Sequence, residues 1–388
     1  MRTTYVPPLT SETAKEIQRK TGAPAAMDNP AKTPKGDTLL VGLDLGTNAS
    51  CVKAAWSGSP DLVVNEVIPT AVGYARDGIV ENLLPGNAKV LYGQLAVKNR
   101  LYLRMVPPLA DGVISDMAAA HDFVRYLRQV INAPAATESR AVVGLPASAD
   151  RAAHDHLCQA LTGFFTQVML VPEPFLAALG FRDEAQLSDP AYLDPVSNSI
   201  FVDIGAGTTD VCLVQGYFPT GEDQVSIPFA GDKVDELLHA AIRREHPDVE
   251  ISRLKVCEIK EQHSYVGKLD APIVVSVIVG GKARKLDLGA PIGDACQQLL
   301  LRAFDCVKNV IAQASPDSVT GALQNIILTG GGSRIRGIDK ELERLLVEDG
   351  YEAPRVLTVG EHYKEYVAQG ALAAARQAKE HQWLDLAG

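Results

Sequence analysis

The chain has 388 residues, of which 46% are apolar and 22% charged, and its formal net charge is −10. This length exceeds what one ordinary hydrophobic core needs, so it predicts two domains or two large lobes. The acidic balance argues against a direct nucleic-acid binder, which carries a basic face. No apolar run reaches the roughly 18 residues of a membrane span, so no transmembrane segment is expected.

The N-terminal stretch, residues 1–37, is rich in Pro, Thr, Lys and Ala and sustains no apolar period. It lacks the apolar centre of a secretory signal. Residues 10–22 are compatible with one short helix, capped by Thr10 or Ser11. We therefore expect a flexible tail before the first lobe.

The six cysteines lie at positions 51, 158, 212, 257, 296 and 306, and no two of them form a C-x-x-C pair. Most lie inside apolar segments, which predicts buried free thiols in a reducing compartment. A cytoplasmic protein is therefore expected.

After the tail, the first half alternates between strand and helix patterns. The expected order is two strands (38–46 and 49–56) around a glycine turn, strand-like pieces (62–75), a helical pattern (86–100), a Pro/Gly loop (106–116), a helix (117–131), a strand (140–148), a helix (150–164), a strand, Pro-Glu-Pro corner and helix (167–181), and a polar loop (183–198).

The second half begins in the same way as the first. The expected order is two strands around a glycine turn (199–216), a strand, loop and helix (224–246), a helix (253–266), a hairpin turning at Gly280 and Gly281 (271–288), a long helix (292–314), a strand, glycine turn and helix (324–346), and a final helix (365–382). This repetition predicts two related α/β lobes with mixed sheets, and a ligand cleft where the glycine turns meet.

Three glycine turns carry the chemistry of the sequence. DLGTN (44–48) and DIGAGTTD (203–210) each combine a strand end, glycines, hydroxyl or amide side chains, and an aspartate. Consecutive backbone amides in such turns bind anions, and the aspartates Asp44 and Asp203 suit a Mg²⁺ ion held mainly through water between them and phosphates. The third turn, Gly330 to Gly332, leaves room for a flat ligand such as adenosine.

Each turn taken alone is also explained as a tight structural turn. Together, in this order, the three resemble the actin/Hsp70/sugar-kinase superfamily. DLGTN is similar to its first phosphate loop, DIGAGTTD to its second, and TGGGSRIRG (329–337) to its adenosine motif. VPEPFLAALG (171–180) and YVAQGALAAA (366–375) are similar to its two connecting helices. The resemblance covers about residues 38–380.

Within the superfamily the sequence resembles bacterial actins. DGVISD (111–116) and EPFLAALG (173–180) are similar to segments of the MreB family. EDQVSI (222–227), KEQHSYVG (260–267) and QNIILTGGGSRIRG (324–337) are similar to the MamK magnetosome-filament family. The resemblance implies an actin-like ATPase fold, with two related lobes divided into subdomains IA, IB, IIA and IIB around a nucleotide cleft.

The resemblance also implies roles for single residues. Asp44 and Asp203 orient the waters of Mg²⁺, and Glu173 positions the water that attacks ATP. Glu173 lies in a rigid Pro-Glu-Pro corner that projects its carboxylate, although a carboxylate favouring a helix N-terminus explains it as well.

The nucleotide contacts that the resemblance implies form a larger set. They are Gly46, Thr47 and Asn48 from one lobe; Gly205, Ala206, Gly207 and Thr208 from the other; Lys260 and Glu261 near ribose and base; and Gly330, Gly331, Gly332 and Arg334 around the adenosine. For Lys260 and Glu261 a solvated helix face is the alternative interpretation. Asp210 receives no catalytic role.

The expected boundaries follow the same resemblance: a tail (1–37), lobe I (38–195, with IB inserted at about 68–105) completed by 361–388, and lobe II (196–360, with IIB inserted at about 228–289). The implied function is a cytoskeletal ATPase that binds ATP or ADP with Mg²⁺ and forms homopolymeric filaments, with adaptor proteins on an organelle membrane or cargo.

Several alternatives remain open at this point. One is a cell-shape or plasmid-segregation actin, the latter acting on DNA only through an adaptor. A second is a membrane-tethered actin anchored through the apolar residues Trp383, Leu384 and Leu386 near the C-terminus. The third is a small-molecule kinase of the same fold, for which no further general base stands out.

Overall fold

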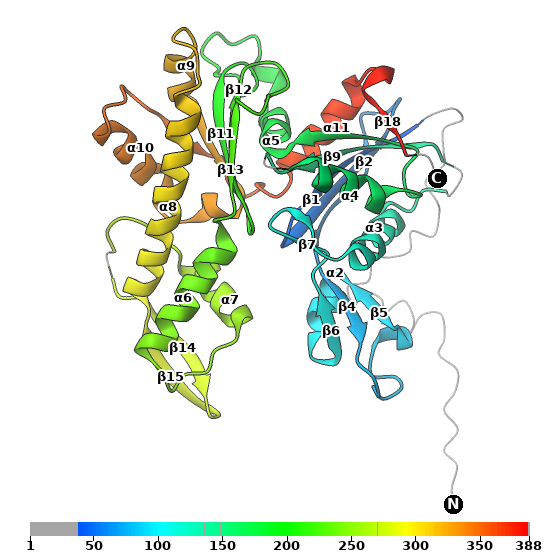
Figure 1. The fold of residues 1–388 in the computed structure, drawn as a ribbon, viewed down its shortest axis with the longest axis vertical. Helices are drawn as coiled ribbons and strands as arrows, with labels where there is room; N and C mark the ends of the chain where they lie inside the picture. The colour runs from blue at the N-terminus through cyan, green and yellow to red at the C-terminus, as the bar shows by residue number, and fades with distance from the viewer. Residues whose placement is uncertain (1–37, 135–136, 148, 270, 387–388) are drawn as a thin grey trace, which may run out of the picture.

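The computed structural model describes residues 38–386, except 135–136, 148 and 270. The expectations of a tail and of a helix over 10–22 therefore lie outside the described residues. Two mixed sheets stand on either side of a pair of helices, with a smaller unit attached beyond each sheet (Figure 1). The α/β class and the duplication predicted from the sequence are both confirmed.

The first sheet has the strand order β18-β10-β9-β1-β2-β3. Its strands are β1 (Leu39–Leu45), β2 (Ala49–Trp56), β3 (Leu62–Pro69), β9 (Ser139–Leu145), β10 (Gln167–Pro172) and β18 (Leu384–Asp385). β1 is antiparallel to β2 and parallel to β9. Alternate residues of β1 face opposite ways, so one face packs on helices α3 (Met117–Ile131) and α4 (Arg151–Leu161).

The second sheet repeats this pattern with the order β13-β12-β11-β16-β17. Its strands are β11 (Ser199–Ile204), β12 (Thr209–Val214), β13 (Gln224–Ile227), β16 (Ile326–Thr329) and β17 (Val356–Thr358). β11 is antiparallel to β12 and parallel to β16, as β1 is to β2 and β9. Its outer face is covered by helices α8 (Gly289–Ile311), α9 (Val319–Leu323) and α10 (Ile338–Glu348), which share its core.

Helices α5 (Glu173–Phe181) and α11 (Tyr366–Gln377) fill the space between the two sheets. They approach so closely that a β-carbon on Gly370 would overlap the carbonyl oxygen of Leu176, and one on Gly180 would overlap that of Tyr366. The two predicted connecting helices therefore make one tightly packed unit that touches both sheets.

A small unit extends from each sheet. The first contains β4 (Val72–Ala75), β5 (Val90–Tyr92), α2 (Gly93–Lys98) and β6 (Leu103–Val106); the second contains α6 (Gly231–Glu245), α7 (Arg253–His263), β14 (Val274–Val279) and β15 (Lys282–Asp287). Between the first unit and α3 lies a short hairpin of β7 (Leu109–Ala110) and β8 (Val113–Ile114). The hairpin predicted to turn at Gly280 and Gly281 is confirmed.

The helical pattern expected over residues 86–100 is only partly right. Helix α2 covers Gly93–Lys98, whereas Val90–Tyr92 is a strand paired with β4. Gly93 has a φ of +52°, which separates the two elements. The strand state of Val90–Tyr92 comes from a partner earlier in the chain, so a local helical period cannot detect it.

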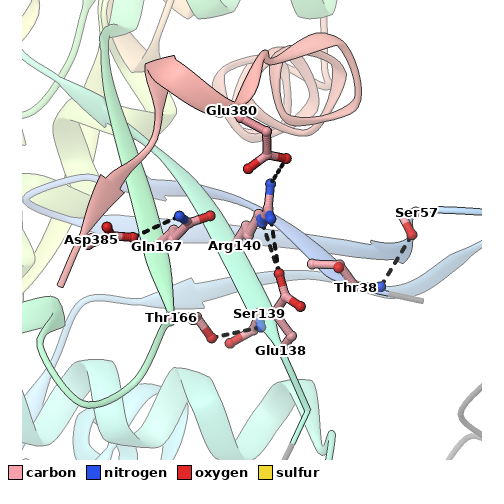
Figure 2. A network of polar contacts seen from close by, with 9 residues as sticks. All are labelled: Thr38, Ser57, Glu138, Ser139, Arg140, Thr166, Gln167, Glu380 and Asp385. Atoms are coloured by element: carbon pink, nitrogen blue, oxygen red, sulfur yellow. Dashed lines mark hydrogen bonds and ion pairs between the residues drawn. The ribbon is translucent and has the colours of Figure 1, made fainter. Parts of the chain in front are cut away.

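The C-terminal segment departs from the expected helix after Gln377 and lies along the edge of the first sheet (Figure 2). Arg140 forms ion pairs with Glu138 and Glu380, and its guanidinium lies 5.6 Å from the centre of the Trp383 ring. Trp383 is only 7% exposed. An anchor formed by this segment would therefore require Trp383 to leave its buried position.

The described cysteines are all free thiols, as predicted. Four of them are buried, whereas Cys158 and Cys257 are half-buried. Across the described part of the chain, no helix combines the length and the apolarity needed to cross a bilayer.

A buried ion pair fixes the start of α11 to the first sheet. Lys53 on β2 is 4% exposed, and its Nζ donates to Oε2 of Glu365 at 2.7 Å. Asn65 donates to the same oxygen at 3.4 Å. The hydrogen bond from Lys53 is the main reason that the pKa of Glu365 falls to about 2. The Nζ of Lys53 has no other hydrogen-bond partner among the described residues.

Glu365→Gln is expected to lower the free energy of unfolding by about 2 kcal/mol at pH 7, because it leaves the ammonium of Lys53 buried and without a countercharge. The pKa of Glu365 is lower in the folded state, so its stabilisation is complete above about pH 4.5 and is lost as the pH falls toward about 2. Urea unfolding at several pH values should show the two proteins converging over this range. A difference that stayed constant from pH 7 to pH 3 would contradict the ion pair, and Glu250→Gln, on the exposed surface, serves as the control.

Candidate nucleotide-binding site

Hydrogen bonds from a neighbouring segment support the first glycine turn. Asp44 is the penultimate residue of β1, and the turn of Gly46 to Asn48 leads into β2. The hydroxyl of Thr70 donates to the carbonyl of Gly46 at 2.7 Å, while the amide of Thr70 donates to the carbonyl of Asn48 at 2.9 Å. The turn is thus held in shape by the segment that follows β3.

The second glycine turn is held by the start of α6. The amide of Gly231 donates to the carbonyl of Gly205 at 3.1 Å, and the amide of Asp232 donates to that of Ala206 at 2.8 Å. These bonds occupy the carbonyls of the turn. The residues of the turn from Gly205 to Thr208 border the cavity described below.

The third turn packs directly on the second. Gly330 has a φ of +72°, and a β-carbon there would overlap Oδ1 of Asp203 and the carbonyl of Ile204. A β-carbon on Gly332 would overlap the side chain of Ile204, whereas Gly331 faces open space. Two of the three glycines are thus required by packing against the second turn, whereas nothing lies near a β-carbon on Gly331.

Lys260 and Glu261 lie on α7 and border the same cavity as the second glycine turn. The Nζ of Lys260 donates to the carbonyl of Gly231 at 3.0 Å and to Oδ2 of Asp235 at 2.9 Å. Its side chain is only 16% exposed. Lys260 is therefore not part of a solvated helix face, and its charge lies beside the turn that α6 supports.

Glu173 is the first residue of α5, immediately after the end of β10. A β-carbon on Gly144, near the end of β9, would lie 2.8 Å from Cγ and 3.5 Å from Oε1 of Glu173. The absence of a side chain at Gly144 thus leaves the space that the glutamate occupies. The rigid corner expected from the Pro-Glu-Pro sequence is present.

Four carboxyl groups gather where the two lobes meet. Burial raises the pKa of Asp44 to about 7 and that of Asp203 to about 8, the latter also because Asp210 and Asp44 are near. Burial, and then the same three aspartates, raises the pKa of Glu173. A cation bound among these groups would therefore be strongly attracted.

The residues of all these segments line one cavity of about 340 Å³. Every residue singled out by the motifs borders it: Asp44, Gly46, Thr47, Asn48, Glu173, Asp203, Gly205, Ala206, Gly207, Thr208, Lys260, Glu261, Gly330, Gly331, Gly332 and Arg334. Arg334 lies at its edge, half exposed, with its guanidinium 3.8 Å from Glu361. The structure thus brings all of the predicted residues together.

Sequence reasoning missed several residues of the same cavity: Gly112, Gly231, Ser264, Tyr363 and Lys364. Gly112 was part of the noted DGVISD segment, and Ser264 follows Lys260 in KEQHSYVG, so both had a nearby signal. Lys364 adds a second lysine to the cavity wall. It lies in the short segment before α11, which has no glycine-rich pattern.

The donor set fits a magnesium ion held through water. No group of three or more His, Cys, Asp or Glu side chains suited to direct metal ligation occurs in the part of the chain that the structure describes. Mg²⁺ needs only one or two carboxylates when phosphates and waters supply its other ligands. Asp44 and Asp203, on the facing ends of β1 and β11, meet that requirement.

Comparison with known proteins agrees with the fold and the cavity. Residues 38–382 match the model of the MreB/Mbl protein family. The chain belongs to this family.

Two similar proteins carry the name actin-like protein MamK. The MreB/Mbl-family chain is 34% identical over 306 residues to that of Paramagnetospirillum magneticum (strain AMB-1), which is 77% of this chain and 82% of the relative. It is 33% identical over 305 residues to that of Magnetospirillum gryphiswaldense, which is 77% and 79% of the two chains.

Solved structures give the same result. MamK in a double helical filament has a TM-score of 0.79 to this MreB/Mbl-family chain at 30% identity, covering 88% of this chain and 100% of that one. A non-polymerising MamK mutant bound to AMPPNP has a TM-score of 0.62 at 30% identity, covering 87% and 99%. MreB5 of Spiroplasma citri bound to ADP, at 21% identity and a TM-score of 0.70 over 89% and 98%, shares the fold. The predicted actin-like fold is confirmed.

Gly330→Ala is expected to destabilise the nucleotide-free protein by about 2 kcal/mol or more, because it combines a positive φ with overlap at Asp203 and Ile204. Gly331→Ala, one residue along, should change the free energy of unfolding by less than about 0.5 kcal/mol, since nothing lies near its β-carbon. Chemical unfolding of both variants measures the difference. Equal stabilities would show that the third turn does not pack on the second as described.

Proposed function

We propose that this chain is a cytoskeletal ATPase that binds MgATP between its lobes, assembles with copies of itself into filaments, and hydrolyses ATP to drive filament turnover. The observation that carries the proposal is the single cavity in which both phosphate-loop sequences, the third glycine turn and Glu173 converge. MamK, to which the chain is similar over most of its length, forms a double helical filament.

The protein's own groups divide the work within the cavity. The amides of the two glycine turns, with the hydroxyls of Thr47 and Thr208, donate to phosphate oxygens from opposite sides. Lys260 and Lys364 add positive charge to the wall. When bound, Mg²⁺ neutralises the phosphates and polarises them toward attack. Asp44 and Asp203 would hold its waters.

Glu173 has the position of a group that orients the attacking water. Asp44 and Asp203 are near enough to raise its pKa, its side chain packs against Gly144 of β9, and Pro172 and Pro174 restrict the backbone on either side of it. Because phosphoryl transfer depends mainly on positioning, a fixed carboxylate is enough to align the water.

We assign the cellular role by similarity. A MamK-like chain would organise or position magnetosomes or similar organelles from the cytoplasm, through adaptor proteins on the organelle membrane or cargo. A cell-shape or plasmid-segregation role of MreB type is the alternative. The lobe and subdomain boundaries given above remain our proposal, with IB corresponding to the unit of β4 to β6 and IIB to that of α6 to β15.

Electron microscopy tests the filament proposal directly. The purified protein should form filaments with MgATP, and more persistent ones with MgAMPPNP, because hydrolysis drives disassembly. Replacing Mg²⁺ with EDTA should abolish them if Asp44 and Asp203 act through the metal. Absence of filaments under every nucleotide condition would reject the cytoskeletal function, and a small-molecule kinase would show no light-scattering increase with MgATP.

Glu173→Gln is expected to lower phosphate release about 100-fold or more, because an amide cannot align and accept a proton from the attacking water as a carboxylate does. Nucleotide binding and filament formation should persist. Glu184→Gln, an exposed residue beyond the same helix, should release phosphate at the wild-type rate. Full activity of Glu173→Gln would remove this residue from the reaction.

A further inference from the structure

Asp210 is a buried carboxylate for which the proposed reaction has no use. It lies near the start of β12, opposite Asp203 on β11, and is 1% exposed. A carboxylate buried to this extent costs stability unless it forms hydrogen bonds. The hydrogen-bond partners of Asp210 therefore indicate its role in the structure.

The hydroxyls of Thr208 and Ser226, in the same lobe, lie close to the carboxyl of Asp210, and one hydrogen bond of this carboxyl crosses to the other lobe. Its Oδ1 accepts from the backbone amide of Ala147 at 3.0 Å. Asp210 belongs to the second sheet, whereas Ala147 lies in the turn that follows β9 of the first sheet. This bond thus joins the two lobes through a buried carboxyl oxygen.

The turn after β9, which Asp210 binds through Ala147, follows the strand end that contacts Glu173. Gly144, three residues before Ala147, leaves the space that Glu173 occupies, and Leu145 is paired with Pro172 at the corner before α5. A shift of this turn would therefore move Gly144 and Leu145, the residues that lie against Glu173 and Pro172. Along this path, only the segment from Gly144 to Ala147 separates Asp210 from Glu173.

The turn after β9 also touches the segment of Asp111 and Gly112, which contacts both phosphate-loop glycine turns. A β-carbon on Gly112 would overlap the ring of Pro146, and the amide of Gly112 donates to Oγ1 of Thr47 at 3.1 Å. The neighbouring Asp111 backbone packs against Gly207 of the second turn. The turn after β9 is thus enclosed by elements of both lobes, and Asp210 supplies its side-chain hydrogen bond from lobe II.

We propose that Asp210 is a positioning residue: by binding the amide of Ala147 it locks the turn after β9 against lobe II and so holds Glu173 in place for hydrolysis. The effect on the reaction rests on the proposed ATPase function, whereas the lock itself belongs to the protein without nucleotide. Asp210 contacts neither water nor phosphate in this role. Its removal should therefore reduce kcat and leave the KM for ATP nearly unchanged.

Three substitutions separate this role from general stability. Asp210→Val removes the acceptor and suits a strand, whereas Asp210→Asn keeps a carbonyl oxygen that can accept from Ala147. Thr209→Val is the matched control, because Thr209 is a buried neighbour in β12 whose hydroxyl donates to Phe229 within the same lobe. Thr209→Val should lower the melting temperature without changing kcat.

Steady-state phosphate release by the full chain is the first measurement. We expect kcat of Asp210→Val to fall by roughly 10-fold to 100-fold, the loss typical of a misplaced catalytic group, with KM within about 3-fold. Asp210→Asn should recover most of the rate. Wild-type kcat in Asp210→Val, an equal loss in Asp210→Asn, or a loss expressed mainly in KM would each overturn the proposal.

Hydrogen exchange of the Ala147 amide, measured without nucleotide, tests the lock apart from the ATPase. Exchange should be at least about 10-fold faster in Asp210→Val and near wild type in Asp210→Asn and Thr209→Val. Unchanged protection in Asp210→Val would overturn the lock. A wild-type protein without ATPase activity would reject the proposed function instead, and exchange would still decide the lock.

Ala147→Pro gives a second route if Asp210→Val does not fold. It removes the donor N–H and leaves the buried carboxylate in place. The same fall in kcat at constant KM is expected, and hydrolysis at the wild-type rate would overturn the proposal.

Discussion

Helices α5 and α11 touch backbone to backbone between the two sheets, and the cavity depends on this contact. Gly180 and Gly370 allow the approach, since any side chain there would overlap a carbonyl of the other helix. Residues of both sheets share one core with this pair. The contact therefore sets the separation of the sheets, and with it the distance between the glycine turns at their edges. A rotation of one lobe against the other must be accommodated at this helix pair.

Functional groups lie at the first residue of α5 and in the segment just before α11. α5 begins with Glu173, and α11 follows the segment that brings Tyr363 and Lys364 to the cavity and Glu365 to Lys53. Rigid packing of the helix bodies thus fixes side chains at their ends. It also holds several carboxyl groups close together, and the pKa values of Asp203 and Glu173 are raised first by burial and then by the neighbouring carboxylates.

The sequence predicted the elements whose chemistry is local. DLGTN, DIGAGTTD and the three glycines near 330 are short runs with their own conformational and chemical requirements, and all of them reach the cavity. Gly231 and Lys364 were missed because long-range packing brings them there. Likewise, Val90–Tyr92 becomes a strand only by pairing with β4. The interpretation of Gly330 and Gly332 as space for the ligand was incomplete, because their neighbours, Asp203 and Ile204, are distant in sequence.

The strand at the C-terminal end of the described chain has a consequence for handling the protein. β18 covers the free side of β10 with two residues, and Trp383 and the Arg140 ion pairs hold it there. Removing the residues from Glu380 onward would expose the hydrogen-bonding edge of an apolar strand. Such an edge recruits strands from other molecules. Truncated preparations would then form non-specific aggregates, which sedimentation alone would not distinguish from ordered polymer.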